Sequence, residues 1–234
     1  MTSGATSTGT GTGTGTAGGL PTGSRGRLFA LGIILELPSA VPGSLDLLIP
    51  LLASDLEADR VDRRFEAIVT LGRLFSSSGG AHLAKRHENA LGRWVGRLAD
   101  KTVPIRREMC SQVAAVLAAH AAALTPALAG PLGKRLVDAD EGVRRAAVAA
   151  VADTACSASI SVVPTSLLLA LAARADDTSA DVVREAVTGL AQAYGAHVAP
   201  LWEAEEGKAR EEDDEEGVKL LLRVSLLGAK LVLQ

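Results

Sequence analysis

Apolar and polar residues follow the pattern of paired helices from about residue 44 onward. In each unit an apolar helix leads into an Asp-rich turn, and a second helix then opens on arginine. The last arginines of four such openings lie 43, 38 and 39 residues apart. The openings are Val61-Asp62-Arg63-Arg64, Ile105-Arg106-Arg107, Val143-Arg144-Arg145 and Val182-Val183-Arg184. A period near forty that contains two helices is typical of HEAT and armadillo repeats and is too long for TPR or ankyrin repeats. The pattern therefore predicts an all-α fold, a HEAT/armadillo-like α-solenoid of about four to five helix pairs.

The second helices share an apolar stripe. Three residues after the last arginine of each opening come Ala67, Cys110, Val148 and Val187. Six residues after it the later three helices have Val113, Val151 and Leu190, whereas the first helix has its apolar residue one position later, at Leu71. Such spacing gives each helix one face to bury against its neighbours.

Turn residues recur just before the second helices. A carboxylate at this place accepts free backbone N–H groups and suits the positive end of the helix dipole. The aspartates in question are Asp100, Asp138, Asp140 and Asp177. Pro104 falls in a first helical turn, where a missing N–H costs nothing.

The remaining segments differ in composition from these repeats. Residues 1–26 are a low-complexity Gly/Thr/Ser segment, which predicts disorder, with an organellar transit peptide as the alternative. Its Gly13–Gly18 stretch has the spacing of a dinucleotide fingerprint, but no strand precedes it and Pro21 follows, so a nucleotide site is not expected. We expect the repeats to occupy residues 27–200, with the apolar run Leu28–Leu35 as a core helix.

Two further segments complete the predicted organisation. Residues 201–217 form an acidic run, expected to be a solvated loop or insertion, and residues 218–234 the final apolar helix of a truncated repeat. Because solenoid ends need polar caps, such an apolar end suggests part of a longer protein. No stretch is expected to reach the roughly 20 apolar residues that span a bilayer.

Composition and charge narrow the functional classes. The formal net charge is −3, which gives no overall attraction to DNA or to an anionic membrane, so no direct sequence-specific nucleic-acid binding and no membrane partner are expected. Only 3% of residues are aromatic, which suits helices packed through small side chains. Cys110 and Cys156 lie far apart, without metal-site spacing, and are interpreted as small core residues.

Candidate chemistry is sparse. The histidines lack a Cys or carboxylate partner at metal-site spacing, and they are His82, His87, His120 and His197. Gly133-Lys134 lacks the first glycine and the Ser or Thr of a phosphate loop. The sequence contains no nucleophile motif with a matching base, so we predict no catalytic residues, no metal site and no cofactor.

Arginines near the starts of the second helices are the candidates for partner binding. They are Arg64, Arg106, Arg107, Arg144, Arg145 and Arg184. The alternative is that they form ion pairs within each repeat, with the neighbouring turn aspartates, each contributing about 0–1 kcal/mol if exposed.

Four segments resemble one family in the same order. Val95–Arg106 (VGRLADKTVPIR) is similar to the "LGRFND..VPIR" stretch of the Pds-five family of sister chromatid cohesion proteins, and Leu71–Phe75 to its "LGRMF". Leu83–His87 resembles the segment that follows, and Glu185–Tyr194 resembles "EA..GLAQ.Y". The resemblance covers roughly residues 44 to 197. Departures are Val183, where the family has a basic residue, together with the Gly-Thr start and the acidic run.

The resemblance implies a nuclear, chromatin-associated HEAT-repeat scaffold, of which this chain would be part. Such a scaffold binds the kleisin subunit of the cohesin complex and, with cohesin regulators, maintains sister chromatid cohesion in mitosis. The alternatives are a generic HEAT/armadillo adaptor in transport or in another chromosome-organising complex and, more remotely, a HEAT-like bilin lyase.

Overall fold

The structure, a computed structural model, describes residues 43–157 and 162–200. The chain divides into two units, Met1–Pro42 and Gly43–Gln234, and all described residues belong to the second. Within these residues every regular element is a helix. The elements are α2 (Ser44–Asp55), α3 (Val61–Ser76), α4 (Gly80–Arg86), α5 (Glu88–Gly96), η1 (Arg97–Ala99), α6 (Val103–Gly133), η2 (Lys134–Val137), α7 (Glu141–Ser157), α8 (Thr165–Ala172), η4 (Ala173–Asp176) and α9 (Ala180–His197).

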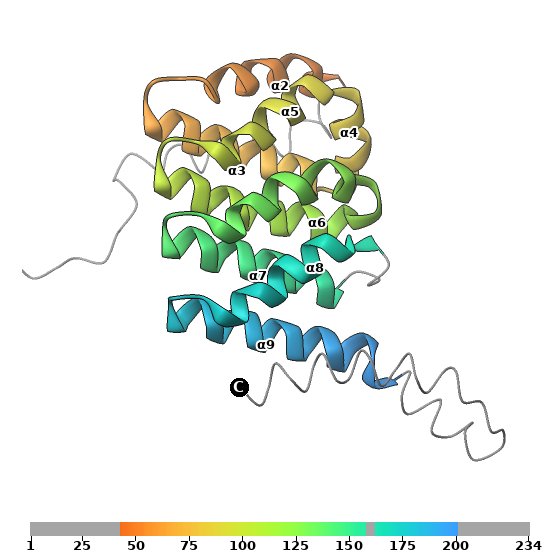
Figure 1. Ribbon diagram of the computed structural model, residues 1–234. Helices are drawn as coiled ribbons and strands as arrows, with labels where there is room; N and C mark the ends of the chain where they lie inside the picture. The colour runs from red at the N-terminus through yellow and green to blue at the C-terminus, as the bar shows by residue number, and fades with distance from the viewer. Residues whose placement is uncertain (1–42, 158–161, 201–234) are drawn as a thin grey trace, which may run out of the picture. The chain divides into compact units, whose positions relative to one another are not determined.

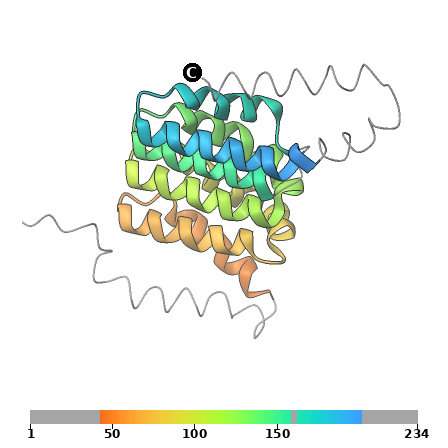
Figure 2. The ribbon, with the colours of Figure 1, turned by 90° about the horizontal axis from the view of Figure 1, so that it is seen from below.

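The helices form four pairs arranged in two layers (Figures 1 and 2). His120 has the non-helical angles φ −142° and ψ 39°, and this kink divides α6 into two helices. The second helices are α3, the first half of α6, α7 and α9, and each packs on the next. The first helices are α2, α4 with α5, the second half of α6, and α8. This arrangement confirms the predicted all-α solenoid.

Trp94 of α5 joins the two layers in the first half of the stack. Its indole is fully buried and its Nε1–H donates to the Ile68 carbonyl of α3 at 2.9 Å. The ring also meets Phe75 edge to face, with centroids 5.6 Å apart. Because buried aromatic pairs contribute beyond the area they bury, this contact anchors α5 on α3.

Small residues let neighbouring second helices approach closely. A Cβ added to Gly189 of α9 would lie 2.3 Å from the Cβ of Ala152 in α7. A Cβ on Gly72 of α3 would lie 2.2 Å from Gln112 Oε1 of α6. A bulkier residue at Gly189 would therefore push α9 away from α7, whereas at Gly72 the obstacle is the flexible end of the Gln112 side chain.

The apolar length of α6 corrects one expectation. Val103–Val137 is long and apolar enough, by length and composition alone, to cross a membrane, so the expectation that no stretch reaches this length was wrong. Within the described residues this segment lies in the middle of the stack, packed on α3 and on α7, and it is kinked at His120. Within the stack, 39% of its most apolar stretch is buried.

Several predicted segments lie outside the described residues. They are the low-complexity residues 1–26, the apolar run Leu28–Leu35, the acidic residues 201–217 and the final residues 218–234. The helices α2 to α9 fall within the predicted repeat region of residues 27–200. Its boundaries remain a prediction.

Candidate binding surface

Three first helices end in the short 3-10 turns η1, η2 and η4, and an aspartate follows each turn. These residues are Asp100, Asp138 and Asp177. Their Oδ1 atoms accept the backbone N–H two residues further on, at 2.8 Å from Thr102, 3.0 Å from Asp140 and 3.0 Å from Ser179. Their Oδ2 atoms accept from the arginine three residues earlier, at 3.2 Å from Arg97, 2.7 Å from Arg135 and 3.0 Å from Arg174. Each carboxylate thus fixes the backbone of its turn.

These contacts correct part of the capping prediction. Asp140 does cap its helix, since its Oδ1 accepts the Val143 N–H at 2.9 Å. Asp100, Asp138 and Asp177 each lie three residues before the first helical residue, so their carboxylates reach a turn N–H instead of a helical one. Pro104 lies in the first turn of α6, as predicted.

A second arginine reaches each of these aspartates from the preceding repeat. Arg64, Arg106 and Arg144 donate from Nε to Oδ2 at 3.0, 2.9 and 3.0 Å, and from Nη2 to Oδ1 at 3.2, 2.8 and 2.8 Å. Their Nη1 atoms donate to backbone carbonyls in the turn of their own repeat, at 2.8 Å to Ala58, 3.0 Å to Asp100 and 3.0 Å to Asp138. We call these three forked pairs, Arg64–Asp100, Arg106–Asp138 and Arg144–Asp177, the arginine–aspartate ladder.

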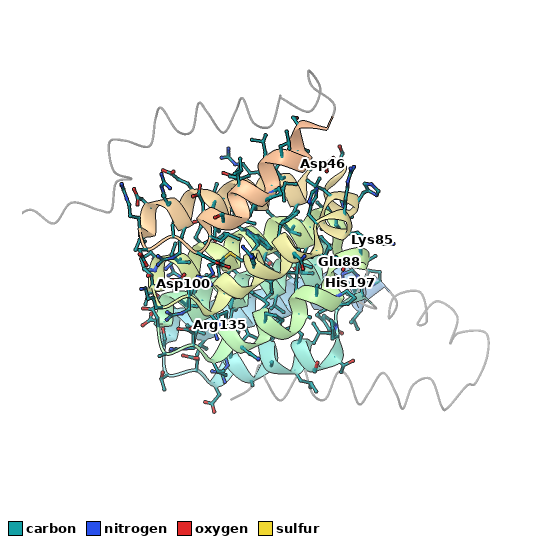
Figure 3. All side chains as sticks on the ribbon, turned by 90° about the horizontal axis from the view of Figure 1, so that it is seen from above. Asp46, Lys85, Glu88, Asp100, Arg135 and His197 are labelled. Carbon is teal, nitrogen blue, oxygen red and sulfur yellow. The ribbon has the colours of Figure 1, made fainter. Side chains whose placement is uncertain are left out.

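The ladder is buried. The side chains of Arg64 and Asp100 are 3% and 2% exposed, and those of Arg106 and Asp138 are 13% and 3% exposed. Figure 3 shows Asp100 and Arg135 on one side of the stack, where the helices are joined by these turns, and His197 on the opposite side. Paired charges in such a place are tolerated because the geometry is bidentate and the remaining donors have carbonyl partners. The expected pairing with turn aspartates is thus found for these three arginines, but each pair joins two repeats instead of lying within one, and it is buried instead of exposed.

The ladder carboxylates are stabilised in their charged form. The hydrogen bond from Arg144 is the main cause that lowers the pKa of Asp177 to about 2. Burial alone would raise the pKa of Asp100 and Asp138, but hydrogen bonds from backbone N–H groups and from the ladder arginines outweigh it and lower both. All three ladder carboxylates are thus ionised at neutral pH.

The ladder also corrects the repeat register. Arg64 corresponds to Arg106, not to Arg107, because these two residues make the same contacts. The corresponding spacing is then 42 residues, and Leu71 aligns with Val113 without any shift. In the last described repeat Val183 occupies the ladder position.

The six candidate arginines therefore fall into two rows. The inner row, Arg64, Arg106 and Arg144, belongs to the ladder. The outer row, Arg107, Arg145 and Arg184, lies one residue further along its helices and is exposed to solvent. Structure thus separates residues that the sequence pattern grouped together.

Outer-row arginines have looser contacts. Arg184 donates toward Asp181 at 2.8 Å and Arg145 lies 3.6 Å from the same carboxylate, with side-chain exposures of 72% and 55%. The Arg107 guanidinium lies over Gly142, since a Cβ there would be 2.5 Å from its Nη2. These three cations lie at repeat spacing on the exposed surface of the second helices.

An open groove of about 1000 Å³ lies between α2 and α4–α5. Its apolar lining includes Ile49 and Ala53, and Lys85 and Glu88 line its edge (Figure 3). On its rim Arg86 and His87 contact Asp46 at 2.7 and 3.1 Å.

Among the described residues, no group of His, Cys, Asp and Glu is arranged to hold a metal ion. His120 and His197 instead contact the backbone carbonyls of Ser77 and Ala155, at 2.6 and 2.7 Å. Burial raises the pKa of the Cys110 thiol to about 12, so Cys110 is the buried core residue that was predicted. Cys156 is only half-buried.

Sequence reasoning missed Arg97, Arg135 and Arg174. Each lies three residues before a ladder aspartate and supports it from within the same turn. The signal was available, because an Arg-x-x-Asp spacing recurs in all three turns.

The helix pairs and the ladder define a repeat protein of the HEAT/armadillo class. Its fold matches a chain in the solved Pds5–Scc1 complex with a TM-score of 0.64 and 15% identity, over 90% of this chain and 30% of that one. A designed armadillo repeat protein in complex with the peptide (KR)4 matches with a TM-score of 0.52 and 21% identity, over 87% of this chain and 92% of that one.

Within that class the chain belongs to the family of sister chromatid cohesion protein PDS5 proteins, whose model matches residues 29–215. The Arabidopsis thaliana protein "Sister chromatid cohesion protein PDS5 homolog A" is 27% identical over 131 residues, which is 56% of this chain and 8% of that protein. The resemblance read from the four sequence segments is confirmed, and the chain corresponds to a small part of its plant relative.

Proposed function

We propose that this chain is a non-catalytic scaffold that binds the kleisin subunit of cohesin in the nucleus, on chromatin, and so helps to regulate sister chromatid cohesion. Membership of the PDS5 family supports this function, as does the shared fold with a chain solved in complex with Scc1. Family membership also favours this proposal over a generic HEAT adaptor in transport.

The exposure of the outer-row arginines is the observation that assigns the proposed kleisin binding to particular residues. Arg107, Arg145 and Arg184 repeat with the helices, are exposed, and lie on one layer of the stack. An extended segment of the kleisin that carries acidic residues at matching intervals would pair with them. The inner row is already committed to the ladder and contributes rigidity instead.

Binding of the purified kleisin subunit to the full 234-residue chain tests the proposal. We expect that charge reversal at Arg107 and Arg145 together weakens binding at least about tenfold and reduces its salt dependence. Arg93→Glu is a matched control, because Arg93 is similarly exposed at 51% but lies on the other helix layer.

The outcomes separate the function from the surface. If the kleisin does not bind the unmodified chain, the proposed function is wrong. If the kleisin binds the variant with charge reversal at Arg107 and Arg145 as tightly as it binds the Arg93→Glu control, the outer row is not the docking surface. Binding alone is proposed, so mixing the two proteins should leave both covalently unchanged.

A further inference from the structure

The last described helix, α9, exposes a face that is buried in every earlier second helix. Val187 is 38% and Tyr194 is 41% exposed, and Leu190 between them is only half-buried. Val187, Leu190 and Tyr194 lie four, seven and eleven positions after Val183, which occupies the inner-row position. The corresponding residues of the earlier helices are all buried, namely Ile68, Leu71 and Phe75 in α3, Cys110, Val113 and Leu117 in α6, and Val148, Val151 and Ala155 in α7. In those helices the following repeat covers the face, whereas in α9 the part of the chain that the structure describes leaves it exposed.

A sequence pattern marks the turn between a first and a second helix. An arginine, an aspartate three residues later and Ile or Val five residues after that are found at three of the four described turns, those that precede α6, α7 and α9. The same pattern occurs once more, at Arg210, Asp213 and Val218, and at no other place in the sequence. The acidic run therefore carries the sequence pattern of the turns that precede α6, α7 and α9.

This register gives the final segment two distinct faces. Lys219 falls at the inner-row position, 36 residues after Val183. All three charged residues of the segment, Lys219, Arg223 and Lys230, occupy positions that in α3, α6 and α7 face the following repeat. Val218, Leu222 and Ala229 correspond to Val182, Ala186 and Ala193 of α9, which are buried against the preceding repeat. The apolar face of the segment is thus the one suited to contact α9.

We propose that the exposed stripe of α9 is the docking site for residues 218–233 of the same chain, which form the second helix of a fifth repeat. Arg210 and Asp213 form its turn, as Arg174 and Asp177 do one repeat earlier. Asp213 then faces Val183, where each earlier repeat has a ladder arginine. The contact between the fourth and fifth repeats therefore lacks the forked ion pair that the three earlier contacts have, and it is stabilised by apolar side chains.

Amide hydrogen exchange on the full chain tests the proposal, independently of kleisin binding, because no partner is present. We expect slow exchange within residues 218–233 of the unmodified chain. Val183→Arg should complete a fourth rung with Asp213, since its guanidinium would also meet the carbonyls of the preceding turn. Exchange in residues 218–233 should then slow by about tenfold, and Asp213→Asn in the same chain should cancel that gain.

Two further variants make the test decisive. Thr188→Arg places the same side chain on an exposed position of α9 and should change nothing. Val187→Glu with Tyr194→Glu should accelerate exchange in residues 218–233 while the circular dichroism of the stack is retained. Unprotected amides in residues 218–233, no response to Val183→Arg, or a gain that persists with Asp213→Asn would each overturn the proposal. The proposal would also be overturned if light scattering showed a dimer that Val187→Glu dissociates, because a second copy of the chain would then occupy the exposed stripe of α9.

Discussion

Asp100→Asn tests whether the ladder holds neighbouring repeats together. The Oδ2 atom of Asp100 accepts from Arg64 Nε at 3.0 Å and from Arg97 Nη1 at 3.2 Å. In the variant an amide NH₂ replaces one oxygen, so a donor faces donors, and the 3% exposed Arg64 loses its countercharge. Removing one partner of a buried pair costs about 3–5 kcal/mol. That is a large part of the roughly 5–15 kcal/mol by which a domain is stable.

Asp181→Asn provides the matched control. Asp181 lies in the first turn of α9 and its carboxylate contacts Arg184 at 2.8 Å, but its side chain is 44% exposed. An exposed pair contributes about 0–1 kcal/mol, so this variant should stay within that range of the unmodified chain. The same chemical change is thus compared at a buried and at an exposed site.

Urea unfolding followed by circular dichroism at 222 nm measures both variants. For Asp100→Asn we expect a lower midpoint, and a broader or two-step curve if the first repeat separates from the others. Two variants that differ by less than about 1 kcal/mol would refute the structural role of the ladder.

Three further outcomes are expected. Gly189→Ala should cost about 1–3 kcal/mol through overpacking against Ala152, and adding Ala152→Gly should restore most of it, as urea unfolding would show. Since the folded-state pKa of Asp177 is depressed to about 2, its contribution to stability is complete above about pH 4 and is lost as the pH falls toward 2. When ellipticity is followed during an acid titration, the Asp177→Asn variant should lack the loss of stability that Asp177 causes in the unmodified chain between about pH 4 and pH 2. Burial and its high pKa should keep Cys110 unreactive toward iodoacetamide at pH 8 until urea unfolds the chain, and rapid modification under native conditions would contradict its core position.

Periodicity was enough to predict the fold, because a two-helix unit near forty residues permits few architectures. The roles of the arginines could not be predicted in the same way. Arg106 and Arg107 are adjacent in sequence and chemically identical, yet Arg106 pairs with Asp138, 32 residues away in the turn of the next repeat, whereas Arg107 lies over Gly142. Burial of that pair follows from how two repeats stack, which a single helix pattern does not contain.

The register error in the first repeat has the same origin. Arg63 and Arg64 form a doublet like those of the later repeats, so aligning the last arginine of each appeared natural. The contacts show that the doublet is shifted by one residue: Arg64 is the inner-row residue, and Phe65 takes the place that Arg107 has in the next repeat. An alignment of the apolar residues Ile68 and Leu71 with Cys110 and Val113 would have revealed this shift.

The two arginine rows have complementary consequences for a binding scaffold. A partner that spans several repeats needs its contact points at fixed intervals, since motion between repeats would cost binding entropy. The ladder fixes those intervals at one end of the second helices, and His120 and His197 contact the preceding repeat at the other end. Because each outer-row arginine follows an inner-row position by one residue, rigidity of the ladder is transmitted directly to the exposed row. The row ends at Arg184, beside Val183, so the last of its three arginines belongs to the repeat whose own rung is missing.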